Sequence, residues 1–376
     1  MAPVYLDYAA TTPCDPAVVK AMLPYFRLEF GNPACGHSHG KTAKQAVETA
    51  RAQVAGLIGA KPNEIFFTSG ATEADNLALK GALPVLGRPY IITCATEHKA
   101  VLKTCKCLED DGFDVTYLPV DGNGFIDLDM FYEIAGPHIG MVSIMAGNNE
   151  TGTVQNLEAI GTICRNEGIL FHTDAAQGFG KIPLNVDRIG ASLMSISGHK
   201  IYGPKGVGAL YVRGGENAPL VPQMDGGGQE CNLRSGTLNV PAIVGFGHAA
   251  ALAQRNLQRD AQHTRQLRER LLHQLANRTE VYETVDVAED ERLPGTLNVA
   301  FPGVRAKDLL GALAGKVSVT SGSACSAGCA KPSHVVQAMR HPYPQSTMRF
   351  TVGRPTTVQQ VDRAAALVGR AVSALR

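Results

Sequence analysis

The feature that most constrains the fold is a regular alternation of short apolar runs with helical patterns between residues 60 and 213. The runs have strand length, and the segments between them, such as 74–80 and 157–166, place apolar residues three and four positions apart. Buried strands that alternate with helices indicate a mostly parallel sheet covered on both faces. The predicted strands are Glu64–Thr68, Tyr90–Thr93, Met141–Met145, Leu170–Thr173, Leu193–Ile196 and Ala209–Val212.

Helical patterns flank this region. Residues 42–58 carry a single apolar stripe, which predicts an amphipathic helix. From residue 241 to about 278 runs a longer helical pattern whose two ends are apolar and whose middle, 254–266, is polar. This arrangement is typical of a helix that bridges two domains.

The rest of the chain predicts a smaller α/β domain, with a strand at 296–301, a helix at 307–314 and a last helix from Val358. A length of 376 residues allows two domains or so. We therefore expect a large domain over residues 15–250, and a small domain formed by residues 1–14 and 251–376.

Charge and cysteine usage exclude several classes of protein. Thirty-five basic and 34 acidic residues leave a net charge of +1, so direct binding to nucleic acid or to a membrane surface is not expected.

Nine cysteines cannot all pair, and their irregular spacing is unlike a secreted disulfide framework. Cys105 and Cys107 lack a second pair at finger-like spacing, so no metal site is expected. With no signal peptide at the start, we expect a cytoplasmic protein.

Polar side chains follow five of the predicted strands. In sheets of this kind ligands bind beyond the carboxyl ends of the strands, so these side chains are expected to meet at one edge. The segment after Thr68 also opens a helix, whose first N–H groups can bind an anion. The residues delivered to this edge are Thr72, His98, Asn149, Asp174, Gln177, Ser197, His199 and Lys200.

Taken singly, each of these residues has an ordinary explanation as a helix cap or a solvated charge. Together they offer an amine in Lys200, a carboxylate in Asp174, a planar ring in His98 and a phosphate cradle. Pyridoxal phosphate needs this combination, because a lysine binds its aldehyde, a carboxylate holds its ring nitrogen protonated and an anion site anchors its phosphate.

At these residues the chain resembles a known family. The strings YLDYAATTP, FTSGATEADN, TEHKAVL, NNETG, SGHKIYGPKGVGALYVR and SGSACSAG, in this order, are similar to those of the NifS/IscS group of cysteine desulfurases. That group belongs to the class V branch of fold-type I pyridoxal-phosphate enzymes. The resemblance runs from Tyr5 to the final helix. It implies a mostly parallel, seven-stranded-type sheet between helices in the large domain, a smaller α/β C-terminal domain, and a homodimer.

The resemblance also implies roles for the cofactor site. Pyridoxal 5′-phosphate would be covalently held on Lys200, with Asp174 on the pyridine nitrogen and His98 stacked on the ring and active in proton transfer. Gln177 and Asn149 would lie beside the ring oxygen O3′. The phosphate would be held by the Ala71 amide, Thr72, Ser197, His199 and, across a dimer interface, Thr237.

The resemblance further implies the residues that handle the substrate, L-cysteine. Arg349 would bind its carboxylate, and Asn32 and Asn149 would lie near it, whereas Arg354 is expected to support the structure. Cys325 would be the nucleophile, which becomes a persulfide as L-alanine is released, with His98 the nearest candidate to deprotonate it. It lies in a run of small residues, 320–329, which favours a mobile loop.

Two alternatives stay open at this point. The first is another class V enzyme, an aminotransferase or a selenocysteine lyase, and the second is a sulfur-relay scaffold with a vestigial cofactor. The sequence does not name the sulfur acceptor, which could be an iron–sulfur scaffold or a thiolation enzyme for tRNA, cofactors or DNA. The roles of Cys35 and Cys329, extra thiols near the expected site, also stay open.

Overall fold

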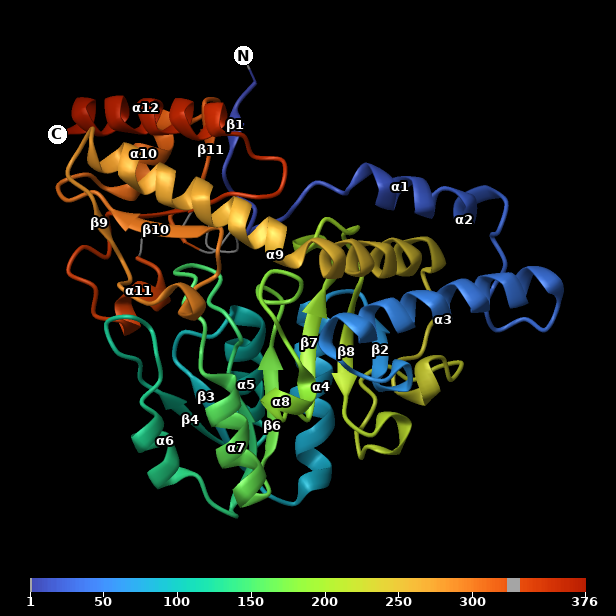
Figure 1. The fold of residues 1–376 in the computed structure, drawn as a ribbon. Helices are drawn as coiled ribbons and strands as arrows, with labels where there is room; N and C mark the ends of the chain where they lie inside the picture. The colour runs from blue at the N-terminus through green and yellow to red at the C-terminus, as the bar shows by residue number, and fades with distance from the viewer. Residues whose placement is uncertain (1, 323–331) are drawn as a thin grey trace.

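The structure, a computed structural model, describes residues 2–322 and 332–376 and is built around a seven-stranded sheet of order β2-β8-β7-β6-β5-β3-β4 (Figure 1). Neighbouring strands from β4 to β7 pair in parallel, whereas β8 is antiparallel to β7 and β2. The predicted, mostly parallel sheet is thus confirmed. The strands are β2 Ile65–Thr68, β3 Tyr90–Cys94, β4 Asp114–Leu118, β5 Ile139–Ser143, β6 Leu170–Asp174, β7 Leu193–Ser197 and β8 Gly208–Val212.

Helices cover both faces of this sheet (Figure 1). On one face α4 and α5 bury apolar side chains such as Leu79 and Val101. On the other face α3, α7 and the first half of α9 bury Val47, Ile160 and Phe246. The helices of this large unit are α1 Pro16–Met22, α2 Pro24–Arg27, α3 Ser38–Ile58, α4 Ala71–Leu86, α5 Lys99–Asp110, α6 Leu128–Ile134, α7 Leu157–Glu167, α8 Val186–Ile189 and α9 Val240–Ala276.

A smaller unit with its own core lies at one end of the sheet (Figure 1). It contains an antiparallel sheet of order β12-β10-β9 and a parallel pair, β1-β11, that brings the N-terminal segment into this unit. The smaller α/β unit that the sequence predicts is therefore present. Its elements are β1 Val4–Tyr5, β9 Tyr282–Glu283, β10 Thr296–Ala300, α10 Ala306–Leu313, β11 Val317–Ser318, α11 His334–Ala338, β12 Thr347–Thr351 and α12 Val358–Leu375.

Helix α9 connects the two units, as its apolar–polar–apolar pattern predicts (Figure 1). Phe246 near its start belongs to the core against the large sheet, whereas Leu271 and Leu275 near its end belong to the core of the smaller unit. Its polar middle crosses between the two cores, where neither sheet is available to cover an apolar side chain. The domain boundary between residues 250 and 251 stays a prediction.

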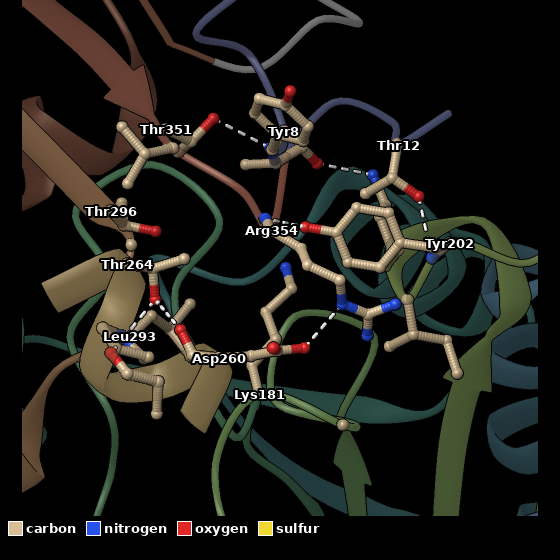
Figure 2. A pocket seen from close by; sticks show the side chains of 18 of the residues that line it. Tyr8, Thr12, Lys181, Tyr202, Asp260, Thr264, Leu293, Thr296, Thr351 and Arg354 are labelled. Atoms are coloured by element: carbon tan, nitrogen blue, oxygen red, sulfur yellow. Dashed lines mark hydrogen bonds and ion pairs between the residues drawn. The ribbon is translucent and has the colours of Figure 1, made fainter. Parts of the chain in front are cut away.

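Arg354, which follows β12, ties the junction together (Figure 2). Its Nε atom donates to Asp260 Oδ2 on α9 at 2.6 Å, and its Nη1 atom donates to Asp15 Oδ2 at 3.2 Å. The guanidinium also lies over the ring of Tyr202, 4.3 Å from the ring centroid. One side chain therefore links the small unit, the bridging helix and the N-terminal segment, which is the supporting role that we expect for Arg354.

The predicted strand Met141–Met145 is wrong at both ends, because β5 spans Ile139–Ser143. Ile144 and Met145 are buried, so their apolar character resembles that of a strand, but the chain leaves the sheet after Ser143. Strand β4 was not predicted at all. It is the edge strand, with alternating exposed positions, and it lacks the continuous apolar run that marks the buried strands.

Candidate active site

A cleft with about 1330 Å³ of empty volume opens where the parallel strands end. Thr237 and Asn32 do not line it, and both are exposed on the surface of the single chain. Cys325 and Cys329 lie outside the described residues. The structure does bring together in this cleft the predicted residues Ala71, Thr72, His98, Asn149, Asp174, Gln177, Ser197, His199, Lys200 and Arg349.

Lys200 ends the short turn that follows β7, and the N-terminal segment crosses over it. Its Nζ atom donates hydrogen bonds to the carbonyl oxygens of Ala9 and Ala10, each at 2.7 Å. Both alanines line the cleft with it. The amine is therefore held at the wall of the cleft by two backbone acceptors.

Asp174 is the last residue of β6, and its Oδ1 atom accepts a hydrogen bond from the Ala176 N–H at 2.9 Å. Burial raises the pKa of this carboxyl group, while His98, the Ala176 N–H and Lys200 act in the opposite direction. A further cationic N–H donor in the cleft would stabilise the carboxylate in the same way. The protonated ring nitrogen of a pyridine is such a donor, so Asp174 fits the predicted partner.

His98 caps the N-terminus of α5, and its Nδ1 atom accepts a hydrogen bond from the Ala100 N–H at 3.1 Å. Because a backbone N–H can only donate, the neutral imidazole carries its proton on Nε2. Burial lowers the pKa of His98, which favours this neutral form. His98 thus presents to the cleft a neutral, planar ring with a donor at Nε2.

The start of α4 forms an anion cradle at one end of the cleft. The helix begins at Ala71, and the first N–H groups of a helix have no acceptor within it. Thr72, Ser197 and His199 line the same cleft. The Nδ1 atom of His199 lies 3.1 Å from Thr11 Oγ1, and burial lowers the pKa of this histidine to about 4. A cradle of N–H, hydroxyl and imidazole groups fits a phosphate group.

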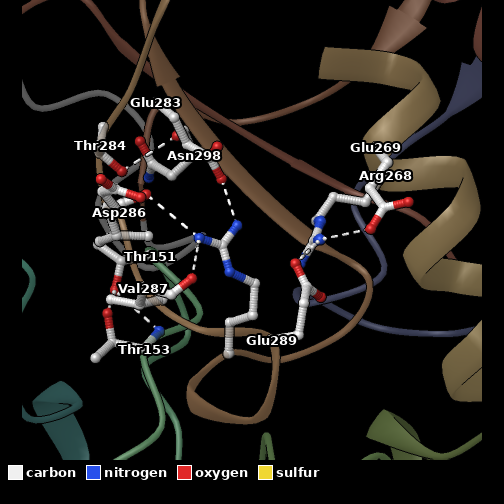
Figure 3. Close-up of polar contacts among 12 residues, drawn as sticks. Thr151, Thr153, Arg268, Glu269, Glu283, Thr284, Asp286, Val287, Glu289 and Asn298 are labelled. Carbon is white, nitrogen blue, oxygen red and sulfur yellow. Dashed lines mark hydrogen bonds and ion pairs between the residues drawn. The ribbon is translucent and has the colours of Figure 1, made fainter. Parts of the chain in front are cut away.

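The segment after β5 reaches the cleft because the smaller unit holds it. Asn298 Nδ2 on β10 donates to the Glu150 carbonyl at 3.1 Å, and the Leu293 N–H donates to the Gly152 carbonyl at 2.8 Å. Figure 3 shows Thr151 and Thr153 of this segment in the same polar cluster as Asn298. These contacts fix the neighbouring Asn149, which the structure places in the cleft.

Arg349 on β12 is 1% exposed and lines the cleft on the side of the smaller unit. Its Nη2 atom donates to Asp7 Oδ1 at 2.7 Å, and its Nη1 atom donates to the Asn149 carbonyl at 2.5 Å. Its buried Nε has no hydrogen-bond partner among the described residues. A buried N–H that lacks an acceptor is costly, and a carboxylate in the cleft would supply one.

Two buried carboxyl groups beside the site were not predicted. Asp75 lines the cleft and is fully buried, as is Glu97, which precedes His98. Burial raises the pKa of both well above the ordinary range, and the charge of Asp174 acts in the same direction. Aspartate and glutamate are rarely buried, so residue type alone gave no signal for this pair.

The buried carboxyl group of Asp75 leads to a testable prediction about how the stability of the protein depends on pH. Because its pKa in the folded state lies above its ordinary value of 3.8, Asp75 keeps a proton that the unfolded chain loses as the pH rises above about 4. The stability that Asp75 contributes therefore falls as the pH rises toward its folded pKa. Asp75→Asn cannot lose stability in this way. As the pH rises, the free energy of unfolding of the variant minus that of the parent should therefore increase, by up to about 1.4 kcal/mol per pH unit.

Urea unfolding of both proteins at pH 4.5 and pH 7 measures this difference. Asp225→Asn, a change at an exposed aspartate, serves as the control and should leave the pH dependence unchanged. If Asp75→Asn lost stability relative to the parent between pH 4.5 and pH 7, Asp75 would be ionised in the folded protein and the prediction would be wrong.

Across residues 2–322 and 332–376 no group of three or more His, Cys, Asp or Glu side chains is placed to hold a metal ion. Within the same residues, no helix combines the length and apolar character needed to cross a membrane.

The chain is similar to characterised proteins over its whole length. It is 47% identical over 380 positions to "Cysteine desulfurase IscS" of Rickettsia felis, a match that covers 100% of this chain and 92% of the relative. Among solved structures, a "NIFS-like protein" is 37% identical with a TM-score of 0.92, over 99% of this chain and 100% of the other. "SspA in complex with cysteine" is 38% identical with a TM-score of 0.82, over 93% of this chain and 98% of the other.

The family model described as "Aminotransferase class-V" matches residues 4–364, which include every element from β1 into α12. Together with the full-length similarity to IscS and NifS-like proteins, this match confirms the resemblance drawn from the sequence motifs. The chain therefore belongs to the class V aminotransferase family.

Proposed function

We propose that this chain is a pyridoxal-phosphate-dependent cysteine desulfurase, which converts L-cysteine to L-alanine and carries the released sulfur as a persulfide on Cys325. The observation that carries this proposal is the convergence of Lys200, Asp174 and His98 on one cleft that ends in an anion cradle. The names of the relatives support it, since they include cysteine desulfurases and a protein solved with cysteine.

The residues of the cleft fit pyridoxal phosphate. When bound, this cofactor supplies an aldehyde that amines attack and a ring that accepts the electron pair left on Cα of the amino acid. Lys200 would bind the cofactor and later accept the Cα proton at Nζ, while Asp174 would accept a hydrogen bond from the ring nitrogen. His98 would cover the ring face with its Nε2–H as a proton donor. The phosphate would lie against Ala71, Thr72, Ser197 and His199.

Cys325 would attack the sulfur atom of L-cysteine as a thiolate. An S–S bond forms, the C–S bond breaks with its electrons retained by carbon, and protonation of that carbon yields alanine. Only the thiolate is competent in this step. Arg349 would hold the substrate carboxylate through its unpartnered Nε–H, and Asn149 would lie next to it.

The proposed role of Arg349 predicts a large change in substrate binding. In Arg349→Gln a charge-assisted hydrogen bond to the carboxylate is lost, which is worth about 1.5–3 kcal/mol, so KM for L-cysteine should rise by roughly 10- to 100-fold. Cysteamine lacks the carboxylate, and the parent protein should bind it far more weakly than L-cysteine. The variant should lose most of that discrimination.

Competition by cysteamine and steady-state alanine formation measure both quantities, and the exposed Arg305→Gln provides the control. Because Arg349 also contacts Asp7, the fold of the variant is checked by circular dichroism. An unchanged KM in a folded variant would contradict the assignment.

We also propose that the active form is a homodimer. Thr237 and Asn32 are the two predicted site residues that lie away from the cleft of their own chain, and both are exposed. Large apolar side chains are exposed on the segment that leads to Asn32, a location suited to a second copy of the chain. They are Val19, Leu23, Phe26, Leu28 and Phe30.

The sulfur on Cys325 would pass to an acceptor protein in the cytoplasm, an iron–sulfur scaffold or a thiolation enzyme. The decisive experiment incubates the purified protein, loaded with pyridoxal phosphate, with L-cysteine and a thiol reductant. Alanine and sulfide should appear in equal amounts, and a persulfide should be found by mass spectrometry before reductant is added. Absence of alanine would overturn the proposal.

A further inference from the structure

A second, small cavity lies beside the cleft and shares Ala9 and Lys200 with it. Lys181 lines this cavity, as Figure 2 shows, and neither the sequence motifs nor the proposed mechanism uses it. Its Nζ atom donates a hydrogen bond to Gln177 Oε1 at 2.9 Å. Gln177 lines the cleft but not this cavity, so Lys181 contacts it from the neighbouring cavity.

This contact begins a continuous chain of hydrogen bonds that ends at Lys200. Lys181 donates to Gln177 Oε1, Gln177 Nε2 donates to the Ala9 carbonyl at 2.9 Å, and the same carbonyl accepts from Lys200 Nζ at 2.7 Å. Because a backbone carbonyl can only accept, the contact with Ala9 fixes which end of the Gln177 amide is nitrogen and leaves Oε1 toward Lys181. Nε2 carries a second hydrogen, which has no acceptor among the described residues and is available to a ligand in the cleft.

Lys181 has no carboxylate partner within ion-pair distance among the described residues. Asp260 lines the same cavity, but it is bound to Arg354 at 2.6 Å. The charged groups that act on Lys181 are the cations Lys200 and Arg349. With burial as the largest cause, they lower the pKa of Lys181 to about 7. Lys181 therefore acts on the cleft through its hydrogen bond to Gln177.

We propose that Lys181 is a positioning residue, which holds and polarises the Gln177 amide so that Nε2 donates to the anionic ring oxygen of the bound cofactor. The inference rests on the proposed function and deepens it. The Ala9 carbonyl keeps Nε2 as the donor in either case, but without Lys181 the Gln177 carbonyl oxygen loses its own donor, so the amide is less firmly held and its Nε2–H is a weaker donor. With Lys181, hydrogen bonds in sequence strengthen one another.

The test compares two ligands of the cofactor-free protein, pyridoxal 5′-phosphate and its 3-O-methyl derivative, whose ring oxygen carries no charge. Dissociation constants are measured by fluorescence titration for the parent and for Lys181→Met. The substitution should weaken pyridoxal phosphate by about five- to tenfold, where tenfold corresponds to 1.4 kcal/mol, and the methylated ligand by less than about twofold.

Lys205→Met removes a different amine of the cleft, which does not contact Gln177 among the described residues, and should affect both ligands alike. In a Gln177→Leu background, Lys181→Met should add no further loss, because the two residues act as one unit. Equal weakening of both ligands by Lys181→Met would overturn the inference and indicate a packing role. If the parent protein failed to bind pyridoxal phosphate on Lys200, the proposed function itself would fail, which is a separate outcome.

Discussion

Replacement of Lys200 by arginine is expected to lower alanine formation from L-cysteine by about a thousandfold or more. Arginine keeps the positive charge, but its guanidinium stays protonated and can neither react with an aldehyde nor accept the Cα proton. Loss of a positioned general base alone costs about 10²- to 10⁴-fold, and loss of covalent attachment adds to it. The measurement is alanine formed per enzyme at saturating L-cysteine and added cofactor.

Borohydride reduction separates this prediction from simple unfolding. In the parent protein, reduction should fix the cofactor on a peptide that contains Lys200, whereas the Lys200→Arg variant should show no such adduct. Lys307→Arg, at an exposed position on α10, is the matched control and should keep full activity. A Lys200→Arg variant that turned over L-cysteine within tenfold of the parent would refute the role given to Lys200.

Much of this site could be predicted because one geometric rule covers it. In a mostly parallel sheet the carboxyl ends of the strands meet at one edge. His98, Asp174 and Lys200 lie at or just beyond the ends of three different strands, so the rule brings them together without any knowledge of side-chain contacts. The exact ends of the strands matter little to this argument. The cleft is correct although the predicted end of β5 is wrong by two residues.

The parts that could not be predicted depend on contacts between residues far apart in the chain. Lys200 is held by the carbonyls of Ala9 and Ala10, and Arg349 is paired with Asp7, more than 300 positions away. Periodicity describes only neighbours in sequence, so it carries no information about such contacts. Lys181 is a further case, because its contact with Gln177 appears only once the chain is folded.

Thr237 and Asn32 are predicted site residues that do not reach the cleft of their own chain. Resemblance to the family places both residues near the cofactor or the substrate, yet each is exposed and away from the cleft of its own chain. A residue that serves the partner's site has no contact to reveal it in one subunit. The prediction for these two residues therefore depends on the dimer that we propose.

The second large effect concerns Cys325, which lies outside the described residues. Cys325→Ser should abolish the formation of alanine from L-cysteine, by about a thousandfold or more, because a serine hydroxyl is not ionised near pH 7 and the thiolate is the nucleophile. Cofactor binding should be unchanged, because none of the cleft residues is altered. The binding of L-cysteine, followed by the change in cofactor absorbance, should also persist.

This combination separates a desulfurase from the alternatives that the sequence leaves open. An aminotransferase of the same family needs no cysteine, so Cys325→Ser would leave its turnover with amino acids intact. A sulfur-relay scaffold would carry sulfur on Cys325 when given a persulfide donor, but it would form no alanine in either protein. Cys231→Ser, at an exposed thiol that does not line the cleft, should keep full activity and excludes a general effect of thiol loss. Full alanine formation by Cys325→Ser would show that another residue attacks the substrate sulfur, which would refute the proposed mechanism.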